Sequence, residues 1–396
     1  MGSARLRRGF AAQTGGVMVD VVSSFWDRVD TALAERDTQG LRRSLKARSA
    51  ETGILDLSNN DYLRLSQHPA VIAAGQQALA KWGASATASP LISGYTAVHA
   101  ELEQKLAAWA GFECGLVWNS GYAANQSVLG RLPQKGDIVL ADRLIHASMV
   151  EGVLRSGARL QRYRHLDVDH LAELLAQHAD GERTVFVVTE SVFSMDGDYP
   201  DLNAMAELKA RYGFVWIVDE AHAVGWYGER GSGLVEETGV TVDVDVFVGT
   251  LGKGLGSMGA FTLFRKASLR DYLINFGGEF IYSTYLAPAS AAAAIAAVDV
   301  AQSMSAERAQ WRQRSREVRA AIAAPDGDSP ILPVVIGDAN ATMRAAESLL
   351  GKGFKVGAVR PPTVPANSSR LRISLSTKLS DSDLTRLVES LEEAQS

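Results

Sequence analysis

Two polar residues that could do chemistry each follow an apolar run typical of a buried strand. Asp219 comes directly after Val215–Val218, and Lys253 lies a few residues after Val244–Val248. Ligands of an open α/β sheet bind beyond the carboxyl ends of its strands, so both side chains are expected at one edge of a sheet. A carboxylate there can keep a pyridine nitrogen protonated, and a desolvated lysine amine can attack an aldehyde. Taken singly, Asp219 would more often be a capping aspartate, and Lys253 would more often be a solvated loop residue.

Two short segments could hold a phosphate group. In Thr250-Leu-Gly-Lys-Gly-Leu-Gly256, a hydroxyl and several backbone amides surround the lysine, as in anion-binding loops. Ser120-Gly-Tyr-Ala-Ala-Asn125 stands between a strand-like run and a helical pattern, where a helix N-terminus presents free amides. Gly121 and Tyr122 would meet the phosphate there, although Tyr122 could equally pack in the core.

Three further side chains accompany these segments. His146 opens a helical pattern after a strand-like run and could stack on a flat cofactor, cap the helix or fill the core. His222 follows Asp219 by three residues and could hydrogen-bond a phenolic oxygen of a cofactor. Ser194 lies beyond another strand-like run, at residues 185–189.

Two motifs suggest nucleotide chemistry but lack its context. Val215–His222 ends in Asp-Glu-Ala-His, as in some helicases, yet the Gly-Lys pairs at Lys253 and Lys352 precede glycine, where a phosphate-binding loop needs serine or threonine. Gly254-Leu-Gly-Ser-Met-Gly259 matches G-x-G-x-x-G, but a strand-like run follows it where a dinucleotide site needs a helix. We therefore expect no helicase, and a dehydrogenase remains an alternative that nicotinamide binding would reveal.

The elements that must position these residues alternate between helix and strand, which favours a largely parallel sheet covered on both faces. We predict a disordered extension over residues 1–22, a helical segment over 23–57, a large cofactor-binding α/β domain over 58–286 and a small C-terminal α/β domain over 287–396. The expected strands are 115–118, 138–141, 185–189, 215–218, 244–248, 260–264, 331–336 and 371–375, and the expected helices include 69–82, 98–109, 287–301, 339–350 and 380–394.

The composition excludes several classes of protein. The chain has 396 residues, a formal net charge of −5 and a single cysteine, Cys114. This charge gives no electrostatic footprint for nucleic acid or an anionic membrane, and one cysteine can form neither an intrachain disulfide nor a cysteine-based metal site. The sequence contains no run of eighteen apolar residues. We expect a cytoplasmic protein without a metal site.

Nine segments, in order along the chain, resemble the α-oxoamine synthases. These are pyridoxal-phosphate enzymes of fold type I, the aspartate-aminotransferase-like fold. The resemblance runs from about Phe25 to Glu392 and is carried by residues 58–63, 93–95, 120–125, 142–148, 189–198, 218–222, 250–256, 281–284 and 370–373. Within the family, Val359–Pro365 and Phe280–Thr284 resemble the branch that forms 8-amino-7-oxononanoate in biotin biosynthesis.

The resemblance implies an acyltransferase that condenses L-alanine with a pimeloyl thioester and releases carbon dioxide and the thiol carrier, which is either coenzyme A or an acyl carrier protein. Lys253 would bind pyridoxal phosphate as a Schiff base and later remove the alanine Cα proton. Asp219 would pair with the pyridinium nitrogen, and His146 would stack on the ring and donate to the developing oxyanion. The phenolic oxygen of the cofactor would be contacted by His222 and Ser194.

The resemblance also implies the remaining binding residues. Gly121, Tyr122 and Thr250 would hold the phosphate, together with Thr284 of the partner subunit, so the active unit would be a homodimer with composite sites. The substrates would meet Asn60, His146, Thr363 and Arg372, of which Arg372 would bind the amino-acid carboxylate. Arg42 would lie near the distal end of the acyl chain.

Two departures from the family pattern leave the substrates open. Ala84–Pro90 replaces a glycine-rich run near the substrate, and Asp219–Val224 is closer to relatives such as 5-aminolevulinate synthase. The first alternative is therefore a sister synthase with another amino acid or acyl group, for example glycine with an acetyl or succinyl thioester. The second alternative is a protein of the same fold that binds the cofactor without catalysis.

Overall fold

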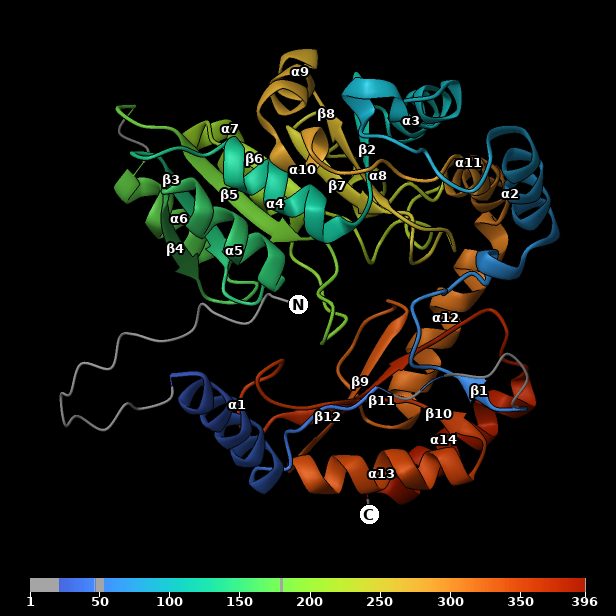
Figure 1. Ribbon diagram of the computed structural model, residues 1–396. Helices are drawn as coiled ribbons and strands as arrows, with labels where there is room; N and C mark the ends of the chain where they lie inside the picture. Colours follow the sequence, from blue (N-terminus) through green and yellow to red (C-terminus); the bar gives the residue numbers. More distant parts are fainter. Residues whose placement is uncertain (1–20, 46, 48–52, 179–180, 396) are drawn as a thin grey trace, which may run out of the picture. The chain divides into compact units, whose positions relative to one another are not determined.

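A mostly parallel sheet forms the centre of the larger part of the chain (Figure 1). The computed structural model describes residues 21–45, 47, 53–178 and 181–395. Within these residues the sheet has seven strands in the order β2-β8-β7-β6-β5-β3-β4. They are β2 (Cys114–Trp118), β3 (Ile138–Asp142), β4 (Arg159–Tyr163), β5 (Val185–Glu190), β6 (Val215–Asp219), β7 (Val246–Thr250) and β8 (Ala260–Phe264). Strands β4, β3, β5, β6 and β7 are parallel, and β8 is antiparallel to both of its neighbours.

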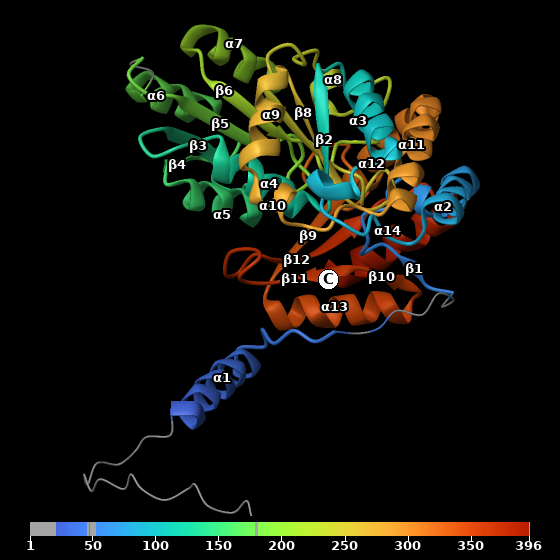
Figure 2. The same ribbon diagram turned by 45° about the horizontal axis from the view of Figure 1, so that its top comes forward.

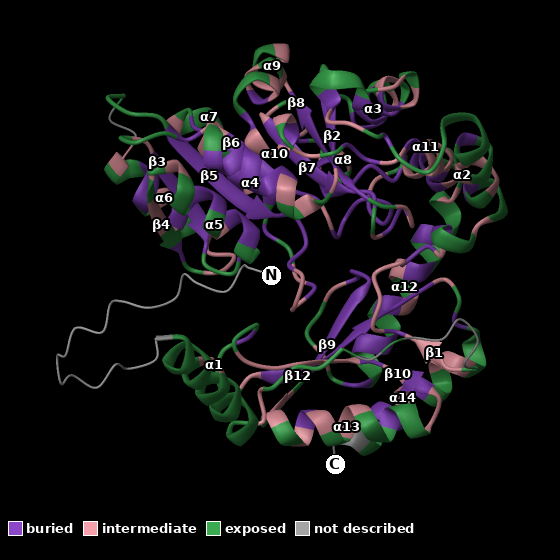
Figure 3. Ribbon diagram, viewed as in Figure 1, coloured by how far each residue is buried: buried purple, intermediate pink, exposed green. Residues whose placement is uncertain are grey.

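Most strands of this sheet are largely apolar because both faces of the sheet are covered. Every residue of β2, β3, β5, β7 and β8 is buried (Figure 3). Successive side chains of a strand point to opposite faces, so complete burial requires cover on each side. The predicted α/β class with a largely parallel sheet is confirmed.

Within this sheet, two strands differ from the prediction by more than one residue, and in the smaller C-terminal part β12 (Ser369–Ser374) begins two residues before the predicted 371. Strand β4 was not predicted, because it is a polar edge strand in which only Tyr163 is buried, so it lacks the apolar run that marked the others. Strand β7 begins and ends two residues later than the predicted 244–248. Asp245 accepts a hydrogen bond from the Trp216 amide (2.8 Å) through its side chain, and the ladder with β6 begins one residue further on. As a consequence, Thr250 is the last residue of a strand.

Helices surround this sheet. The longer ones are α2 (Pro69–Trp82), α3 (Ala97–Ala110), α4 (Gly121–Arg131), α5 (Ala147–Ser156), α6 (Val168–His178), α7 (Leu202–Tyr212), α9 (Ala267–Phe276) and α11 (Pro288–Ser303), and the short ones are η1 (Leu65–Gln67), η2 (Pro90–Gly94), α8 (Leu234–Glu237) and α10 (Gly278–Ile281). Proline opens α2 and α11, where its missing amide proton costs nothing. Helix α4 packs on α5 and on strands β7 and β8 (Figure 2).

The C-terminal part forms a second, smaller sheet. Its elements are α12 (Ser305–Ala321), β9 (Ile331–Gly337), α13 (Ala339–Gly351), β10 (Phe354–Lys355), β11 (Gly357–Val359), β12 (Ser369–Ser374) and α14 (Asp381–Gln395). Strands β11, β12 and β9 are antiparallel, α13 packs on them, and β1 (Leu55–Asp56) pairs with β10 (Figure 2). Residues 53–396 form one compact unit, and the boundary predicted at residue 287 stays a prediction.

The first unit, residues 1–52, contains helix α1 (Val21–Thr38). Of the extension predicted over residues 1–22, all but the last two residues lie outside the described part, and those two begin α1. Arg42 forms an ion pair with Asp37 of the same unit (2.6 Å). Among the described helices, no single one is long and apolar enough to cross a membrane, and one bent pair, α11 with α12, meets that test by length and composition alone.

Candidate active site

A cavity of about 200 Å³ lies where strands β5, β6 and β7 end. Glu190, Asp219 and Thr250 are the last residues of these three strands, and all three line it. This is the edge of the sheet at which ligands are expected. Eight of the nine predicted cofactor residues meet there, namely Gly121, Tyr122, His146, Ser194, Asp219, His222, Thr250 and Lys253. The other lining residues are Asn125, Ser148, Glu190 and Ala221.

Asp219 is held rigidly in this cavity. Its Oδ2 accepts a hydrogen bond from Asn125 Nδ2 (2.8 Å), and its Oδ1 accepts one from the Ala221 amide (2.9 Å). Asn125 also donates to Ser148 Oγ (3.2 Å), while its own Oδ1 is buried without a hydrogen-bond partner among the described residues. The carboxylate is therefore fixed in orientation and almost entirely removed from bulk solvent, with 6% of the residue exposed.

A second carboxyl group, Glu190, lies beside Asp219. The two residues are paired across β5 and β6, and Glu190 is buried. Burial, reinforced by the nearby charge of Asp219, raises the pKa of Glu190 to about 8. Its Oε1 accepts a hydrogen bond from the His146 amide (2.6 Å). The sequence reasoning missed Glu190, although its place at the end of β5, like that of Asp219 on β6, was a signal that could have found it.

Lys253 begins a chain of hydrogen bonds that leads away from the cavity. Its Nζ lies 2.7 Å from His222 Nε2, and His222 Nδ1 lies 2.6 Å from the hydroxyl of Tyr62. Tyr62 in turn donates to Asn60 Oδ1 (3.3 Å). Tyr62 is completely buried and was not predicted as a site residue, because it lies 160 residues before His222.

Burial lowers the pKa of both basic groups in this chain of hydrogen bonds, Lys253 and His222. Burial lowers the pKa of Lys253 to about 8, although the negative charges of Asp219 and Glu190 act to raise it. Burial, followed by the charges of Lys253 and Arg372, lowers the pKa of His222 well below its ordinary value. His222 is therefore neutral at neutral pH, and the amine of Lys253 loses its proton far more readily than a solvated lysine does.

His146 stands at the N-cap of α5, as predicted, and its ring is exposed on the cavity. Its Nδ1 accepts a hydrogen bond from the Ser148 amide (3.3 Å) and lies 2.8 Å from Ser148 Oγ. An accepting Nδ1 leaves the proton of the neutral ring on Nε2. Burial also lowers the pKa of His146, which favours this neutral form. The imidazole can thus donate a hydrogen bond from Nε2 into the cavity.

The N-terminus of α4 supplies the anion-binding part of the cavity. Ser120 caps the helix by accepting a hydrogen bond from the Ala123 amide (3.1 Å), so Gly121 and Tyr122 are the first helical residues to face the space. A side chain added at Gly121 would meet no atom within 4 Å, so the backbone there is open to a ligand. Opposite it, the Thr250 hydroxyl is held by the Gly259 carbonyl (3.1 Å). Free amides, a helix dipole and a hydroxyl suit a phosphate group.

The remaining predicted site residues do not line this cavity. Arg372, on β12, is buried and donates through Nε to the Ser194 carbonyl (2.6 Å), so it fixes the loop that carries Ser194. Thr363 lines a neighbouring cavity instead. Thr284 is exposed, and its carbonyl accepts a hydrogen bond from Asn119 (2.6 Å). Within the described residues, Asn60 accepts a hydrogen bond from Tyr62 and is connected to the site only through it. Arg42 lies in the first unit.

The chain is similar to known proteins over most of its length. Residues 52–391 match the model of the family described as aminotransferase class I and II. An 8-amino-7-oxononanoate synthase of Trichlorobacter lovleyi is 42% identical over 373 residues, which are 90% of this chain and 94% of that protein.

Solved structures agree in fold. A serine palmitoyltransferase from S. paucimobilis with bound PLP-myriocin aldimine has a TM-score of 0.87 and 26% identity, over 95% of this chain and 98% of that one. An 8-amino-7-oxononanoate synthase from Francisella tularensis has a TM-score of 0.72 and 27% identity, over 86% of this chain and 97% of that one. The predicted fold type is confirmed, and the chain belongs to the aminotransferase class I and II family.

Proposed function

We propose that this protein is a pyridoxal-phosphate-dependent acyltransferase of biotin biosynthesis that condenses L-alanine with a pimeloyl thioester to 8-amino-7-oxononanoate, carbon dioxide and the free thiol carrier. The observation that carries this proposal is the cavity itself, in which an amine, a carboxylate and a helix N-terminus converge. The 8-amino-7-oxononanoate synthases named above, to which the chain is similar, support the choice of substrates.

The residues present fit the cofactor group by group. The N-terminus of α4, with Thr250, matches its phosphate, Asp219 matches its pyridine nitrogen, and Lys253 matches its aldehyde. The buried Asn125 Oδ1 is a further polar atom at this place that a ligand could satisfy. When bound, pyridoxal phosphate supplies an electron sink for negative charge on the Cα atom of the amino acid.

Each side chain of the site then has a separate role in the reaction. The neutral amine of Lys253 takes the Cα proton of alanine, and its lowered pKa makes that form available near neutral pH. His222 orients the amine through the 2.7 Å contact. His146 donates from Nε2 to the oxygen of the thioester carbonyl as charge develops there. Arg372 is the predicted partner of the alanine carboxylate, and Asp219 holds a negative charge where the ring nitrogen needs one.

The site is proposed to be composite, in a homodimer. Thr284 was predicted to reach the phosphate of a second copy, and in this chain it is exposed and does not line its own cavity. A cytoplasmic location and delivery of the acyl group on coenzyme A or an acyl carrier protein stay predictions.

A second candidate is a sister synthase with a different substrate pair. It is favoured by the serine palmitoyltransferase structures, whose TM-scores of 0.87 exceed the 0.72 of the Francisella tularensis synthase. A matrix of alanine, glycine and serine against pimeloyl, acetyl, succinyl and palmitoyl thioesters, analysed by mass spectrometry of products, separates the two. We expect the highest kcat/KM for alanine with the pimeloyl thioester. A higher value for any other pair would refute the proposed substrates.

A further inference from the structure

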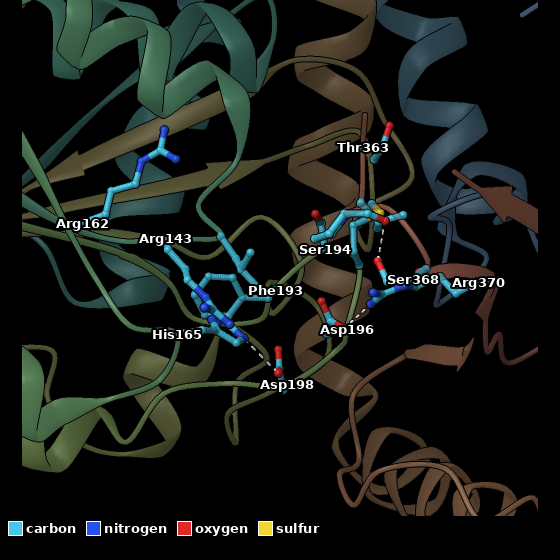
Figure 4. Close-up of a pocket in the computed structure, with 14 residues that line it drawn as sticks. Arg143, Arg162, His165, Phe193, Ser194, Asp196, Asp198, Thr363, Ser368 and Arg370 are labelled. Carbon is cyan, nitrogen blue, oxygen red and sulfur yellow. Dashed lines mark hydrogen bonds and ion pairs between the residues drawn. The ribbon is translucent and has the colours of Figure 1, made fainter. Parts of the chain in front are cut away.

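A larger cavity, of about 570 Å³, adjoins the candidate active site. Ser194 lines both cavities, and Arg143 of the larger one stands three residues before His146 of the smaller one. One side of the larger cavity comes from the segment after β3 and from β4, and the other side from residues 363–370 (Figure 4). A chain attached to a reacting group beside Ser194 could extend into this space.

The charges of this cavity do not cancel. Arg370 forms an ion pair with Asp196, and His165 is held between Asp142 (2.9 Å) and Asp198 (3.0 Å). Arg143 and Arg162, by contrast, are exposed, and neither guanidinium has a hydrogen bond or ion pair within the described residues. Two positive charges without partners thus stand on one side of the cavity (Figure 4), in a chain whose formal net charge is −5.

The same cavity also has an apolar wall. Leu144 and Phe193 lie in the segments that follow β3 and β5, and Val364 and Pro365 lie in the segment before β12. Phe193 and Val364 are buried, so this wall is a fixed part of the structure. An apolar wall beside unpaired arginines suits a methylene chain that ends in an oxyanion, because a guanidinium can meet a carboxylate with two charge-assisted hydrogen bonds.

We infer that this cavity takes the acyl chain of the substrate and that Arg143 and Arg162 bind the carboxylate at its distal end. The inference rests on the proposed function, because it presupposes a dicarboxylic acyl thioester. It places carboxylate recognition on two residues that the sequence reasoning did not consider, whereas that reasoning assigned the distal end of the chain to Arg42, which is ion-paired with Asp37.

The test compares pimeloyl-CoA with heptanoyl-CoA, which has the same length but ends in a methyl group. The variants are Arg143→Ala, Arg162→Ala and the double replacement. We expect the double variant to raise KM for pimeloyl-CoA at least tenfold, which corresponds to about 1.4 kcal/mol, and to change KM for heptanoyl-CoA less than twofold. Arg159→Ala is the matched control, since Arg159 is exposed on the same strand but does not line the cavity, and it should change neither value.

Direct binding gives a readout that does not depend on turnover. By calorimetry, wild-type protein should bind pimelate more tightly than heptanoate, and the double variant should lose this preference. Unchanged melting temperatures should accompany the loss, because both side chains are exposed and neither guanidinium forms a hydrogen bond or ion pair within the described residues.

Several results would overturn the inference. If both CoA thioesters lose affinity equally, and the N-acetylcysteamine thioester of pimelate, which carries no phosphate, keeps its KM, then the arginines bind carrier phosphates. If Arg42→Ala alone abolishes the preference for the carboxylate, the sequence-based assignment to Arg42 is right and the cavity does not bind the carboxylate. Failure of the wild type to convert alanine and pimeloyl-CoA would instead refute the proposed function, and this would be visible before any variant is made.

Discussion

Replacing Tyr62 with phenylalanine removes one buried hydroxyl and leaves the ring in place. That hydroxyl stands 2.6 Å from His222 Nδ1 and 3.3 Å from Asn60 Oδ1. Because the pKa of Lys253 is about 8, its amine is mostly charged at pH 7 and donates to His222 Nε2. Nδ1 of His222 then carries the ring proton and donates to Tyr62, whose own proton goes to Asn60. In the Tyr62→Phe variant His222 loses the acceptor for its proton.

The size of the effect follows from burial. Tyr62 has 0% of its surface exposed and His222 has 5%, so water cannot easily replace the lost acceptor. A buried donor left without a partner costs about 1–3 kcal/mol. The ring volume is almost unchanged, so no cavity adds to this cost. We therefore expect the free energy of unfolding to fall by about 2 kcal/mol.

The measurement is a urea titration of the cofactor-free protein at pH 7, followed by tryptophan fluorescence at one protein concentration. Tyr163→Phe is the matched control, because Tyr163 is 3% exposed and its hydroxyl is buried without a hydrogen-bond partner among the described residues. Its removal should not lower the free energy of unfolding, because no hydrogen bond is lost with it. Equal losses in the two variants would show that the contact with His222 contributes nothing specific, and the proposed hydrogen-bond chain would be wrong.

The other predictions concern the cofactor and the reaction. Borohydride reduction of the loaded protein should place a pyridoxyl group on Lys253 in peptide maps, and an adduct on another residue would disprove its role. Asp219→Asn should still bind the cofactor but lose at least about a hundredfold in kcat, because an amide supplies no charge for the ring nitrogen; near-normal turnover would contradict this. Lys253 attacks only as the neutral amine, so the rate of cofactor uptake, followed by absorbance, should rise with pH, reach half of its maximum near pH 8 and level off at higher pH. Glu190→Gln should move this inflection to lower pH, because Glu190, whose own pKa is about 8, carries a partial negative charge there that raises the pKa of Lys253, and an unmoved inflection would count against the pairing. Mixing inactive Lys253→Ala with inactive Thr284→Ala should restore activity in hybrid dimers, whereas a fully active monomer in sedimentation would exclude composite sites.

Much of the fold and of the site was predictable from sequence. Strands buried on both faces must be apolar throughout, and so β2, β5 and β8 were located to within a residue or so. The carboxyl ends of parallel strands share one edge, so polar residues that follow such runs had to converge. The sequence therefore predicts that Asp219, His146 and Lys253 lie close together, and all three line one cavity.

The tertiary structure decided which residues meet from distant parts of the chain. Tyr62 reaches His222 across 160 residues, and no local pattern distinguishes it from other buried tyrosines. The pairing of Glu190 with Asp219 depends on the register of β5 and β6, which spacing along the chain does not encode. Arg143 and Arg162 line one cavity because β3 and β4 lie side by side, and β4 is a polar edge strand that periodicity does not reveal. Local patterns report which residues are buried and how each segment is shaped, whereas the partners of a side chain depend on packing between segments that are far apart in sequence.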